Sequence, residues 1–571
     1  MITMSPESKP VVTYFAETDF RARRTRFGIR DEDRSRHVYV IGKTGMGKSN
    51  LLENMAIQDI QNGHGIAFMD PHGSAADRLM DYVPPERVKD VINFSPFDLE
   101  HPISFNVLED VGRDQRHLVS SGLMSAFKKI WVDAWSARME YILQNTLLAL
   151  LEYPGATLLG VNRMLSDKSY RQKVVNNVTD PGVKSFWVDE FAKYTERMAA
   201  EAVPAIQNKV GQFTSNPLIR NIVGQSRSSL DFRRLMDEKK ILIINLSKGR
   251  MGESNANLIG SMLITKLYLT AMSRANLSGA ELRTLPPFYF FVDEFQSFAN
   301  ESFANILSEA RKYKLSLTIA HQYIEQMSEE VRAAVFGNVG SIITFRVGPF
   351  DAEVLEKIFF PTFTKEDLVN LGRYQLYLTL MIDGIGSPPF SAVTLPPFPL
   401  LQESHRDKII EHSRQAYAQP RVMVEQEIAK WHSEASFTGV PPTAKPTSPP
   451  IFVAKPIFVS PARPAPHYSP TPHPSAPSLR PPVTTETSKL AVSLAALRPM
   501  SGSSGRRIVS ETEKAKSKEE LRRSLEKIMT KAPPPDLGRH ASIGSVASKQ
   551  QPARGPNGEV PREVLEKMLK G

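Results

Sequence analysis

The chain of 571 residues is too long for one compact core and indicates roughly two to four folded units. It contains no cysteine, which excludes disulfides, thiolate metal sites and a cysteine nucleophile. It also lacks the run of roughly 20 apolar residues that spans a bilayer, so we expect a cytoplasmic protein, with peripheral contact at the inner face of the cell membrane left open.

The formal net charge of +10 is concentrated near the C-terminus. Residues 437–571 hold 21 of the 71 Lys and Arg residues and 10 of the 61 Asp and Glu residues, which leaves 50 and 51 for the first 436 residues. The same segment holds 22 of the 43 prolines. This composition predicts a basic, Pro-rich, disordered tail, and the high charge is therefore weak evidence for a nucleic-acid groove elsewhere.

Two short stretches of the tail place apolar residues on one helical face. They are Leu521, Leu525, Ile528 and Met529, and then Val564, Leu565, Met568 and Leu569. Partner docking and transient helices in a disordered tail are the two interpretations.

Residues 1–36 are interpreted as a lead-in segment, and residues 37–112 as the first part of an α/β domain. The apolar runs HVYVIG, GIAFMD and DVINFS predict strands, and GMGKSNLLENMAIQDIQ predicts a helix between the first two. This order is a βαβ opening.

Residues 113–236 are predicted to form an all-α insertion. Five apolar side chains share one helical face: Met139, Ile142, Leu143, Leu147 and Leu150. The residues Tyr153-Pro154-Gly155 then signal the end of that helix.

Residues 237–395 return to the α/β pattern. Predicted strands are KKILIINLS, PFYFFVDEF, LSLTIAHQ, GSIITFRVG and YQLYLTLMID, and a predicted helix is ESNANLIGSMLITKLYLTAMSRA. Continuous apolar strands that alternate with helices favour a mainly parallel sheet covered on both faces. Residues 396–436 are interpreted as a C-terminal helical extension.

An octet with the Walker A spacing follows the first predicted strand and opens the first predicted helix. Its members, with the residue after it, are Gly42, Lys43, Thr44, Gly45, Met46, Gly47, Lys48, Ser49 and Asn50. The glycines let backbone N–H groups converge on phosphate oxygens, Lys48 reaches the β and γ phosphates, and Ser49 coordinates Mg²⁺. An accidental glycine turn is the alternative. The context favours a P-loop with ATP and Mg²⁺ as cofactors.

The buried strand FYFFV ends in Asp293 and Glu294, which is typical of a Walker B motif. Asp293 would hold Mg²⁺ through its water shell, and Glu294 would orient or deprotonate the attacking water. Caps at the end of a strand are the alternative for both carboxylates.

Three further residues are candidates for charge stabilisation. Gln322 ends the strand LSLTIAH and could sense the γ-phosphate, or it is an ordinary polar residue at a strand end. Arg311 could act as an arginine finger in a neighbouring subunit, or it complements a helix C-terminus. Arg346, at a later strand end, competes for the finger role.

Four residues on the same predicted edge have open roles. Asp70 could tune water or metal, and His72 could cap a turn. Lys248 and Arg250 could contact DNA or a neighbour's nucleotide, or they belong to a solvated loop.

The motifs resemble, in their order, the HerA/FtsK division of P-loop motors, and within it the type IV secretion coupling proteins of the TraD/TraG kind. They are IGKTGMGKS, MDPHG, NLSKG, FFVDEFQSF, EARKYKLSLTIAHQ and FRVG, and they cover about residues 15–395. The resemblance implies a RecA-like ATPase that assembles as a homo-hexamer and threads DNA through its channel.

The sequence also departs from that family. Coupling proteins commonly carry an N-terminal membrane anchor, which this sequence lacks, so stable membrane attachment is not expected. Without a nuclease motif or a recognisable winged helix, DNA contact is expected at phosphates and without sequence specificity. Secretion or DNA-processing proteins are expected to bind the insertion or the tail.

An ATP-driven DNA translocase is the leading hypothesis, acting either in conjugation or on cellular DNA. A DNA-independent secretion ATPase and a nucleotide-gated assembly scaffold are the alternatives.

Overall fold

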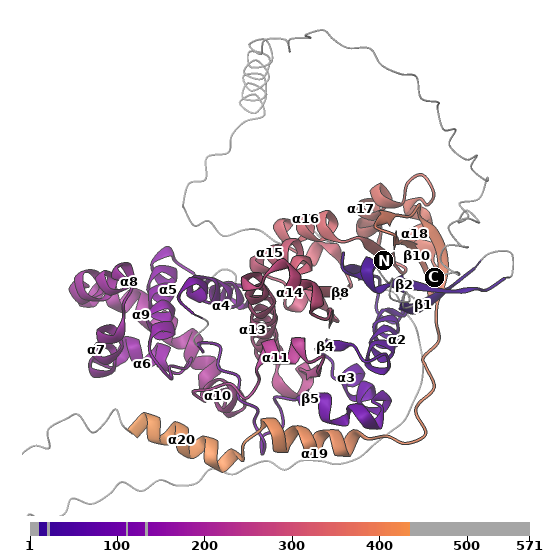
Figure 1. Cartoon of the computed structure of the whole chain (residues 1–571). Helices are drawn as coiled ribbons and strands as arrows, with labels where there is room; N and C mark the ends of the chain where they lie inside the picture. The colour runs from indigo at the N-terminus through magenta and orange to yellow at the C-terminus, as the bar shows by residue number, and fades with distance from the viewer. Residues whose placement is uncertain (1–10, 20–22, 110–111, 132–134, 434–571) are drawn as a thin grey trace, which may run out of the picture. The chain divides into compact units, whose positions relative to one another are not determined.

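The computed structural model describes residues 11–19, 23–109, 112–131 and 135–433 (Figure 1). The predicted tail, with both of its helical patterns, lies outside these residues.

Thirteen strands occur among the described residues. They are Val12–Thr18 (β1), Arg26–Arg30 (β2), Val38–Ile41 (β3), Gly65–Asp70 (β4), Val91–Phe94 (β5), Ile241–Asn245 (β6), Phe288–Val292 (β7), Leu315–His321 (β8), Ser341–Thr344 (β9), Gln375–Thr379 (β10), Met381–Ile382 (β11), Ile385–Gly386 (β12) and Phe390–Thr394 (β13).

The α-helices fall into four groups along the chain. The first helices are Asp31–Arg34 (α1), Lys48–Gln61 (α2) and Ser74–Leu79 (α3). The insertion holds Arg116–Ile130 (α4), Ala137–Glu152 (α5), Gly160–Ser166 (α6), Lys168–Asn177 (α7), Pro181–Ser185 (α8), Glu196–Thr214 (α9), Pro217–Val223 (α10) and Phe232–Asp237 (α11). Then follow Lys248–Met251 (α12), Glu253–Met272 (α13), Gly279–Thr284 (α14), Glu301–Glu309 (α15), Glu329–Asn338 (α16), Pro349–Phe359 (α17) and Lys365–Asn370 (α18). The last helices are Arg406–Tyr417 (α19) and Arg421–Ser433 (α20).

Eleven strands form one sheet in the order β2-β1-β13-β10-β9-β3-β8-β7-β4-β6-β5. The seven strands from β9 to β5 pair in parallel, and the four strands from β10 to β2 extend the sheet antiparallel. The prediction of a mainly parallel α/β sheet is confirmed.

The strands of the sheet centre are continuous apolar runs because both faces of the sheet are covered. Every residue of β3, β4, β6, β7, β8 and β9 is buried. Side chains of β3 alternate between two apolar clusters, with Tyr39 and Ile41 in one and Val38 and Val40 in the other. Helices α2 and α3 cover the second cluster, whereas α13, α15 and α16 cover the first.

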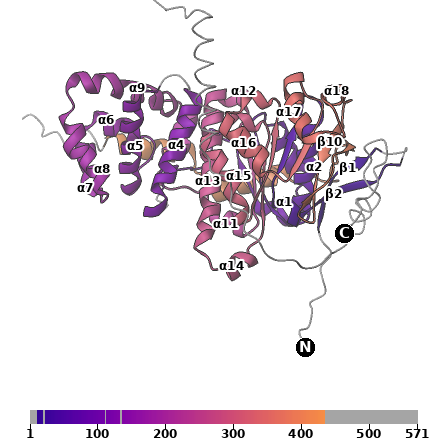
Figure 2. The same cartoon turned by 90° about the horizontal axis from the view of Figure 1, so that it is seen from above.

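Helices form the insertion throughout its described part. All five apolar side chains predicted to share a face of α5 are buried, and α5 ends at Glu152, directly before the predicted stop. Helix α13 lies beside α4, and their apolar side chains belong to the same cluster as the sheet (Figures 1 and 2). The insertion is therefore anchored on one face of the parallel sheet.

Residues of the predicted lead-in and of the C-terminal extension pack on the α/β domain. Strands β1 and β2 form a hairpin that joins the sheet through β13, with Ala16 opposite Thr394. Helix α19 packs on β5, and α20 packs on α10 of the insertion. Among the described residues, no helix combines the length and the apolar character needed to cross a bilayer.

Candidate functional site

The loop between β3 and α2 is fixed from both neighbouring strands. The N–H of Gly42 donates to the carbonyl of His321 at 3.2 Å, and the N–H of Lys43 donates to the carbonyl of Arg346 at 2.8 Å. Gly47 has φ +125°, and a Cβ at this position would lie 3.0 Å from the Phe345 ring. Only glycine fits here without strain, which explains the glycine directly before Lys48.

The ammonium group of Lys48 lies inside this loop. Its Nζ donates to the carbonyl of Gly42 at 2.7 Å and to that of Lys43 at 3.3 Å. Burial lowers the pKa of Lys48, and the carboxylates of Glu294 and Asp293 act in the opposite direction. The loop thus holds a cation where its backbone N–H groups and the N-terminus of α2 favour an anion.

Ser49 and Asp293 meet across the sheet edge. Ser49 is the second residue of α2, and its hydroxyl donates to Oδ2 of Asp293 at 2.7 Å. Burial raises the pKa of Asp293 to about 6, although the hydrogen bond from Ser49 has the opposite effect. A hydroxyl and a carboxylate are hard oxygen donors, so the pair fits the ligand chemistry of Mg²⁺.

Glu294 is held by its backbone and by two amide side chains. Its φ of 47° and ψ of 46° lie in the left-handed region, which is costly for a non-glycine residue and is concentrated at functional sites. Its Oε1 accepts from Nε2 of Gln322, and its Oε2 accepts from Nε2 of Gln296. Glu294 as a whole is only 8 % exposed, and the two amides fix the orientation of its carboxylate.

Gln322 connects this carboxylate to the phosphate loop. Its Oε1 accepts a hydrogen bond from Oγ1 of Thr44 at 3.0 Å, while its Nε2 donates to Glu294. Hydrogen bonds therefore connect Thr44 in the loop after β3, Gln322 after β8 and Glu294 after β7. The structure brings together the predicted residues Lys48, Ser49, Asp293, Glu294 and Gln322; Gln296 is an addition that the sequence pattern did not single out.

A buried histidine lies directly before Gln322. Nδ1 of His321 and the Tyr39 hydroxyl are 3.0 Å apart, and the ring is fully buried. Burial lowers the pKa of His321 to about 3, so the ring stays neutral near neutral pH. This contact supports the carboxyl ends of β3 and β8 from within the sheet.

Three predicted site residues lie outside this cluster. Asn50 donates from Nδ2 to the carbonyl of Leu395 at 2.8 Å. Arg346 contributes its carbonyl to the loop and is half-buried. Arg311 is exposed and precedes β8, so it lies at the amino edge of the sheet, roughly 20 Å from the carboxyl edge.

Asp70 caps α3 rather than facing the loop. Its carboxylate accepts from the backbone N–H groups of His72 at 2.7 Å, Ala75 at 2.8 Å and Ala76 at 3.1 Å. These bonds satisfy the first turn of the helix. The carboxylate of Asp70 therefore serves the local fold, while the His72 side chain is exposed.

The two cations after β6 are also engaged locally. Lys248 donates from Nζ to the Ser297 hydroxyl at 2.8 Å and to Glu253 at 3.2 Å. The guanidinium carbon of Arg250 lies 3.6 Å from the centre of the Phe97 ring. Lys248 thereby joins α12 to the turn that follows Glu294.

A phosphate-type loop, a buried carboxylate pair and a bridging amide thus stand at the carboxyl edge of a mainly parallel sheet. This fold and site define a P-loop NTPase with a RecA-like core. A family model described as type IV secretory system conjugative DNA transfer matches residues 5–340, and the chain belongs to this family. The resemblance to type IV secretion coupling proteins is confirmed.

Comparison with solved structures gives similar but distant chains. The plasmid coupling protein TrwB in complex with ADP and Mg²⁺ is 14 % identical with a TM-score of 0.48, over 66 % of this chain and 89 % of that chain. VirB4 of Thermoanaerobacter pseudethanolicus is 12 % identical with a TM-score of 0.43, over 63 % of this chain and 89 % of that chain. A comparison with curated proteins gave no match.

Proposed function

We propose that this chain hydrolyses ATP with Mg²⁺ and uses the energy to move DNA, as a coupling protein of conjugative transfer. The contact of Ser49 with Asp293, beside the chain of hydrogen bonds from Glu294 through Gln322 to Thr44, carries this proposal. Membership of the conjugative DNA transfer family supports the DNA substrate.

Binding of the triphosphate rests on the loop and on Lys48. The N–H groups of Gly42 and Lys43 are bonded to the neighbouring strands, so the backbone N–H groups between Thr44 and Ser49 are the ones that bind the phosphates. Lys48 exchanges its bonds to the loop carbonyls for bonds to phosphate oxygens. Ser49 and Asp293 would hold Mg²⁺, which when bound neutralises charge on the β and γ phosphates. ATP and Mg²⁺ are therefore the proposed substrate and cofactor.

Hydrolysis rests on Glu294. Its carboxylate orients the attacking water and accepts a proton from it, while the amide donors Gln322 and Gln296 hold both of its oxygens. Gln322 also contacts Thr44 of the loop, so it is placed to respond to the terminal phosphate. These groups are fixed before the reaction, which lowers the cost of reorganisation.

Assembly as a homo-hexameric ring is part of the proposal. Because Arg311 is exposed at the amino edge, it cannot reach the loop of its own chain, and a role as finger requires a neighbouring subunit. Arg346 stays in the proposal as the competing candidate for the finger, and Asn50 as a nucleotide-binding residue directly after the loop.

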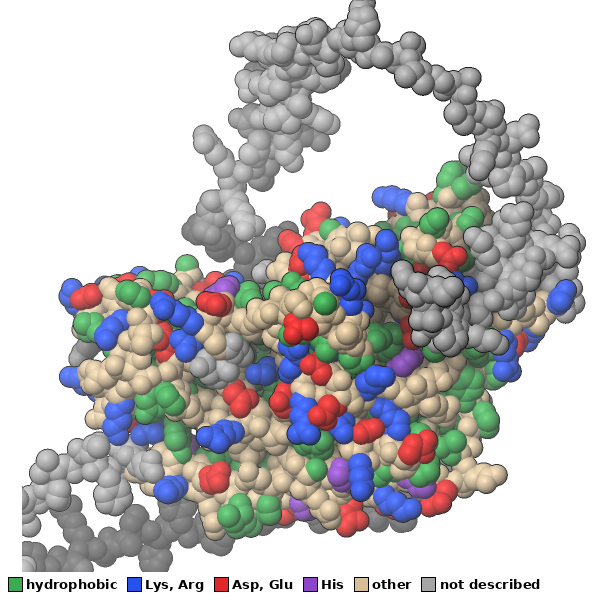
Figure 3. All heavy atoms as spheres, viewed as in Figure 1, with side chains coloured by type: hydrophobic (Ala, Val, Ile, Leu, Met, Phe, Trp, Pro, Cys, Tyr) green, Lys and Arg blue, Asp and Glu red, His purple; other side chains and the backbone are tan. Residues whose placement is uncertain are grey.

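DNA would be held through its phosphates and without sequence specificity. On the face shown in Figure 3, Lys and Arg side chains are interspersed with Asp and Glu side chains, in keeping with the balanced charge of residues 1–436. We therefore place the DNA contacts in a ring channel, where six copies of a few cations combine, and the contacts to secretion or DNA-processing proteins on the insertion or the tail. Such a protein would work on the cytoplasmic side, with peripheral contact at the membrane.

The test is the steady-state ATPase rate of the full chain with and without duplex or single-stranded DNA, with Glu294→Gln as the background control. Stimulation by DNA supports a translocase. Robust hydrolysis that is indifferent to DNA instead favours a secretion ATPase that moves other cargo. If Glu294→Gln retains full cellular function, a nucleotide-gated scaffold replaces the motor.

A further inference from the structure

The order of the strands gives the bound nucleotide a direction, on the basis of the proposed function. The groups that act on the terminal phosphate follow β7 and β8, which lie on one side of β3. Strands β9 and β10 lie on the other side. With the γ-phosphate near Glu294 and Gln322, the α-phosphate and the base extend from the loop toward β9 and β10.

Tyr374 occupies the position where this path continues. It directly precedes β10, whose residue Tyr377 pairs with Thr344 near the end of β9. The start of β10 therefore reaches the same edge of the sheet as the phosphate loop. A Cβ built on Gly47 would lie 3.1 Å from Cδ1 of Tyr374, so the ring passes directly beside the loop.

The backbone of Tyr374 is fixed to the loop. Its N–H donates to the carbonyl of Met46 at 3.1 Å, and its carbonyl accepts from the N–H of Thr394 at 3.0 Å. Its φ of 69° is left-handed, a conformation that a bulky residue adopts only when its surroundings impose it. These contacts fix the backbone that carries the ring beside the phosphate loop.

The Tyr374 ring remains open to a flat partner. Tyr374 is 40 % exposed although its backbone is held, and the guanidinium carbon of Arg373 lies 4.7 Å from the ring centroid. A planar, delocalised group thus already rests against this ring from an exposed side chain. A purine base has the same planar character and a larger stacking surface.

We infer that Tyr374 is the stacking platform for the nucleobase and that Arg373 yields its place on the ring to the base. Stacking on an aromatic face tolerates every base, because every base has a π-face. The platform therefore strengthens the binding of ATP and of GTP alike, and Tyr374 does not discriminate between the two nucleotides.

The experiment compares ATP, GTP and inorganic tripolyphosphate, each with Mg²⁺, by calorimetric titration of the full chain. Tyr374→Ala is expected to weaken the binding of ATP and GTP about 10-fold or more and to leave the binding of tripolyphosphate unchanged. Tyr374→Phe keeps an aromatic ring and is expected to bind ATP and GTP as the unmodified chain does. Tyr323→Ala is the matched control, since this residue is equally 40 % exposed and follows Gln322 on the opposite side of β3. Tyr323→Ala should leave the affinities for ATP, GTP and tripolyphosphate at their unmodified values.

Two results overturn the platform while the phosphate site stands: unchanged ATP affinity in Tyr374→Ala, or an equal loss for ATP and tripolyphosphate, which indicates a distorted loop. If the unmodified chain binds none of the three ligands, the proposed ATPase and the platform are overturned together.

Discussion

Replacing Gln322 with leucine tests whether the link between the phosphate loop and Glu294 serves hydrolysis. The change keeps the approximate size of the side chain but removes its bonds to Glu294 and to the Thr44 hydroxyl. A hydrogen bond to a charged group contributes about 1.5–3 kcal/mol. If this contribution is realised in the transition state, the maximal hydrolysis rate falls roughly 10- to 150-fold.

Binding should be spared, because the bonds between the Lys48 ammonium group and the loop carbonyls do not involve Gln322. The assay is single-turnover hydrolysis of ATP beside an equilibrium titration with ATP. Gln326→Leu provides the control, since Gln326 is an exposed glutamine four positions further along the chain. Hydrolysis at the unmodified rate, or a loss of ATP affinity by the same factor, would refute the reasoning.

Three other substitutions separate binding, assembly and stability. Lys48→Ala removes the cation of the loop and should abolish nucleotide binding in a calorimetric titration; tight binding by this variant would falsify the phosphate contact. Arg311→Ala should leave ATP binding intact and lower hydrolysis by the assembled protein roughly 10³-fold, whereas full activity would return Arg311 to a surface role at a helix end. Burial lowers the pKa of His37 to about 4, and its ring accepts from the N–H of Leu317 at 3.1 Å. Because the unfolded chain binds the proton more strongly, stability is lost as pH falls through the window from about 6.5 to about 4, by about 2 kcal/mol between pH 7.5 and pH 5. Denaturant titrations should show a flatter pH dependence for His37→Asn, and equal slopes would contradict the assignment.

The parallel core could be predicted because its information is local. Each central strand is a continuous apolar run, since burial on both faces removes the need for polar residues. The phosphate loop is likewise a contiguous motif whose spacing has a mechanical reason. The sequence also predicts that Asp293, Glu294 and Gln322 lie near this loop, because the carboxyl ends of parallel strands share one edge of a sheet.

The antiparallel extension could not be predicted in the same way. Strands β1 and β2 are assigned to a lead-in segment from the sequence, because their burial alternates and their link to the sheet is β13, at the far end of the domain. The role of Asp70 was open for a related reason. A carboxylate at a strand end can face a ligand or cap the next helix, and only the positions of the N–H groups of α3 decide it.

Tyr374 shows the same limit at the site. Nothing near it in sequence marks it, because its place beside the loop depends on the pairing of β10 with β9 and on one backbone bond to Met46. Gln296 is similar, since its contact with Glu294 depends on the left-handed turn between strand and helix.

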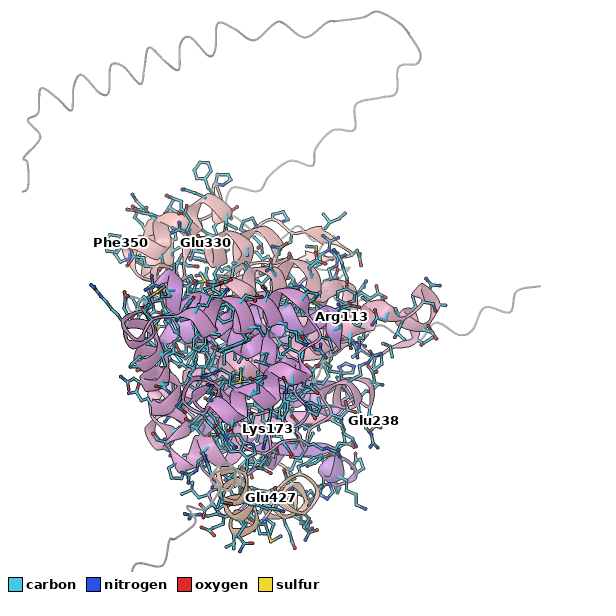
Figure 4. All side chains as sticks on the ribbon, turned by 90° about the vertical axis from the view of Figure 1, so that its left-hand side faces the viewer. Arg113, Lys173, Glu238, Glu330, Phe350 and Glu427 are labelled. Atoms are coloured by element: carbon cyan, nitrogen blue, oxygen red, sulfur yellow. The ribbon has the colours of Figure 1, made fainter. Side chains whose placement is uncertain are left out.

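The C-terminal helices reach both parts of the fold. On α20, Val424 and Ile428 are buried against Leu159 of the insertion, while Glu427 points outward (Figure 4). Arg163 of the insertion donates from Nη1 to the carbonyl of Trp431 at 2.9 Å. The extension is therefore folded onto the domain rather than appended to it.

Helix α19 covers the outermost parallel strand, β5. The N–H of Asn93 donates to the Ser413 hydroxyl at 3.0 Å, and Ile409 is buried in the apolar cluster on that face. An uncovered edge strand offers its backbone to any other strand and invites aggregation. A chain that ended before Arg406 would expose this edge, so the helix protects the protein from edge-to-edge association as well as extending its surface.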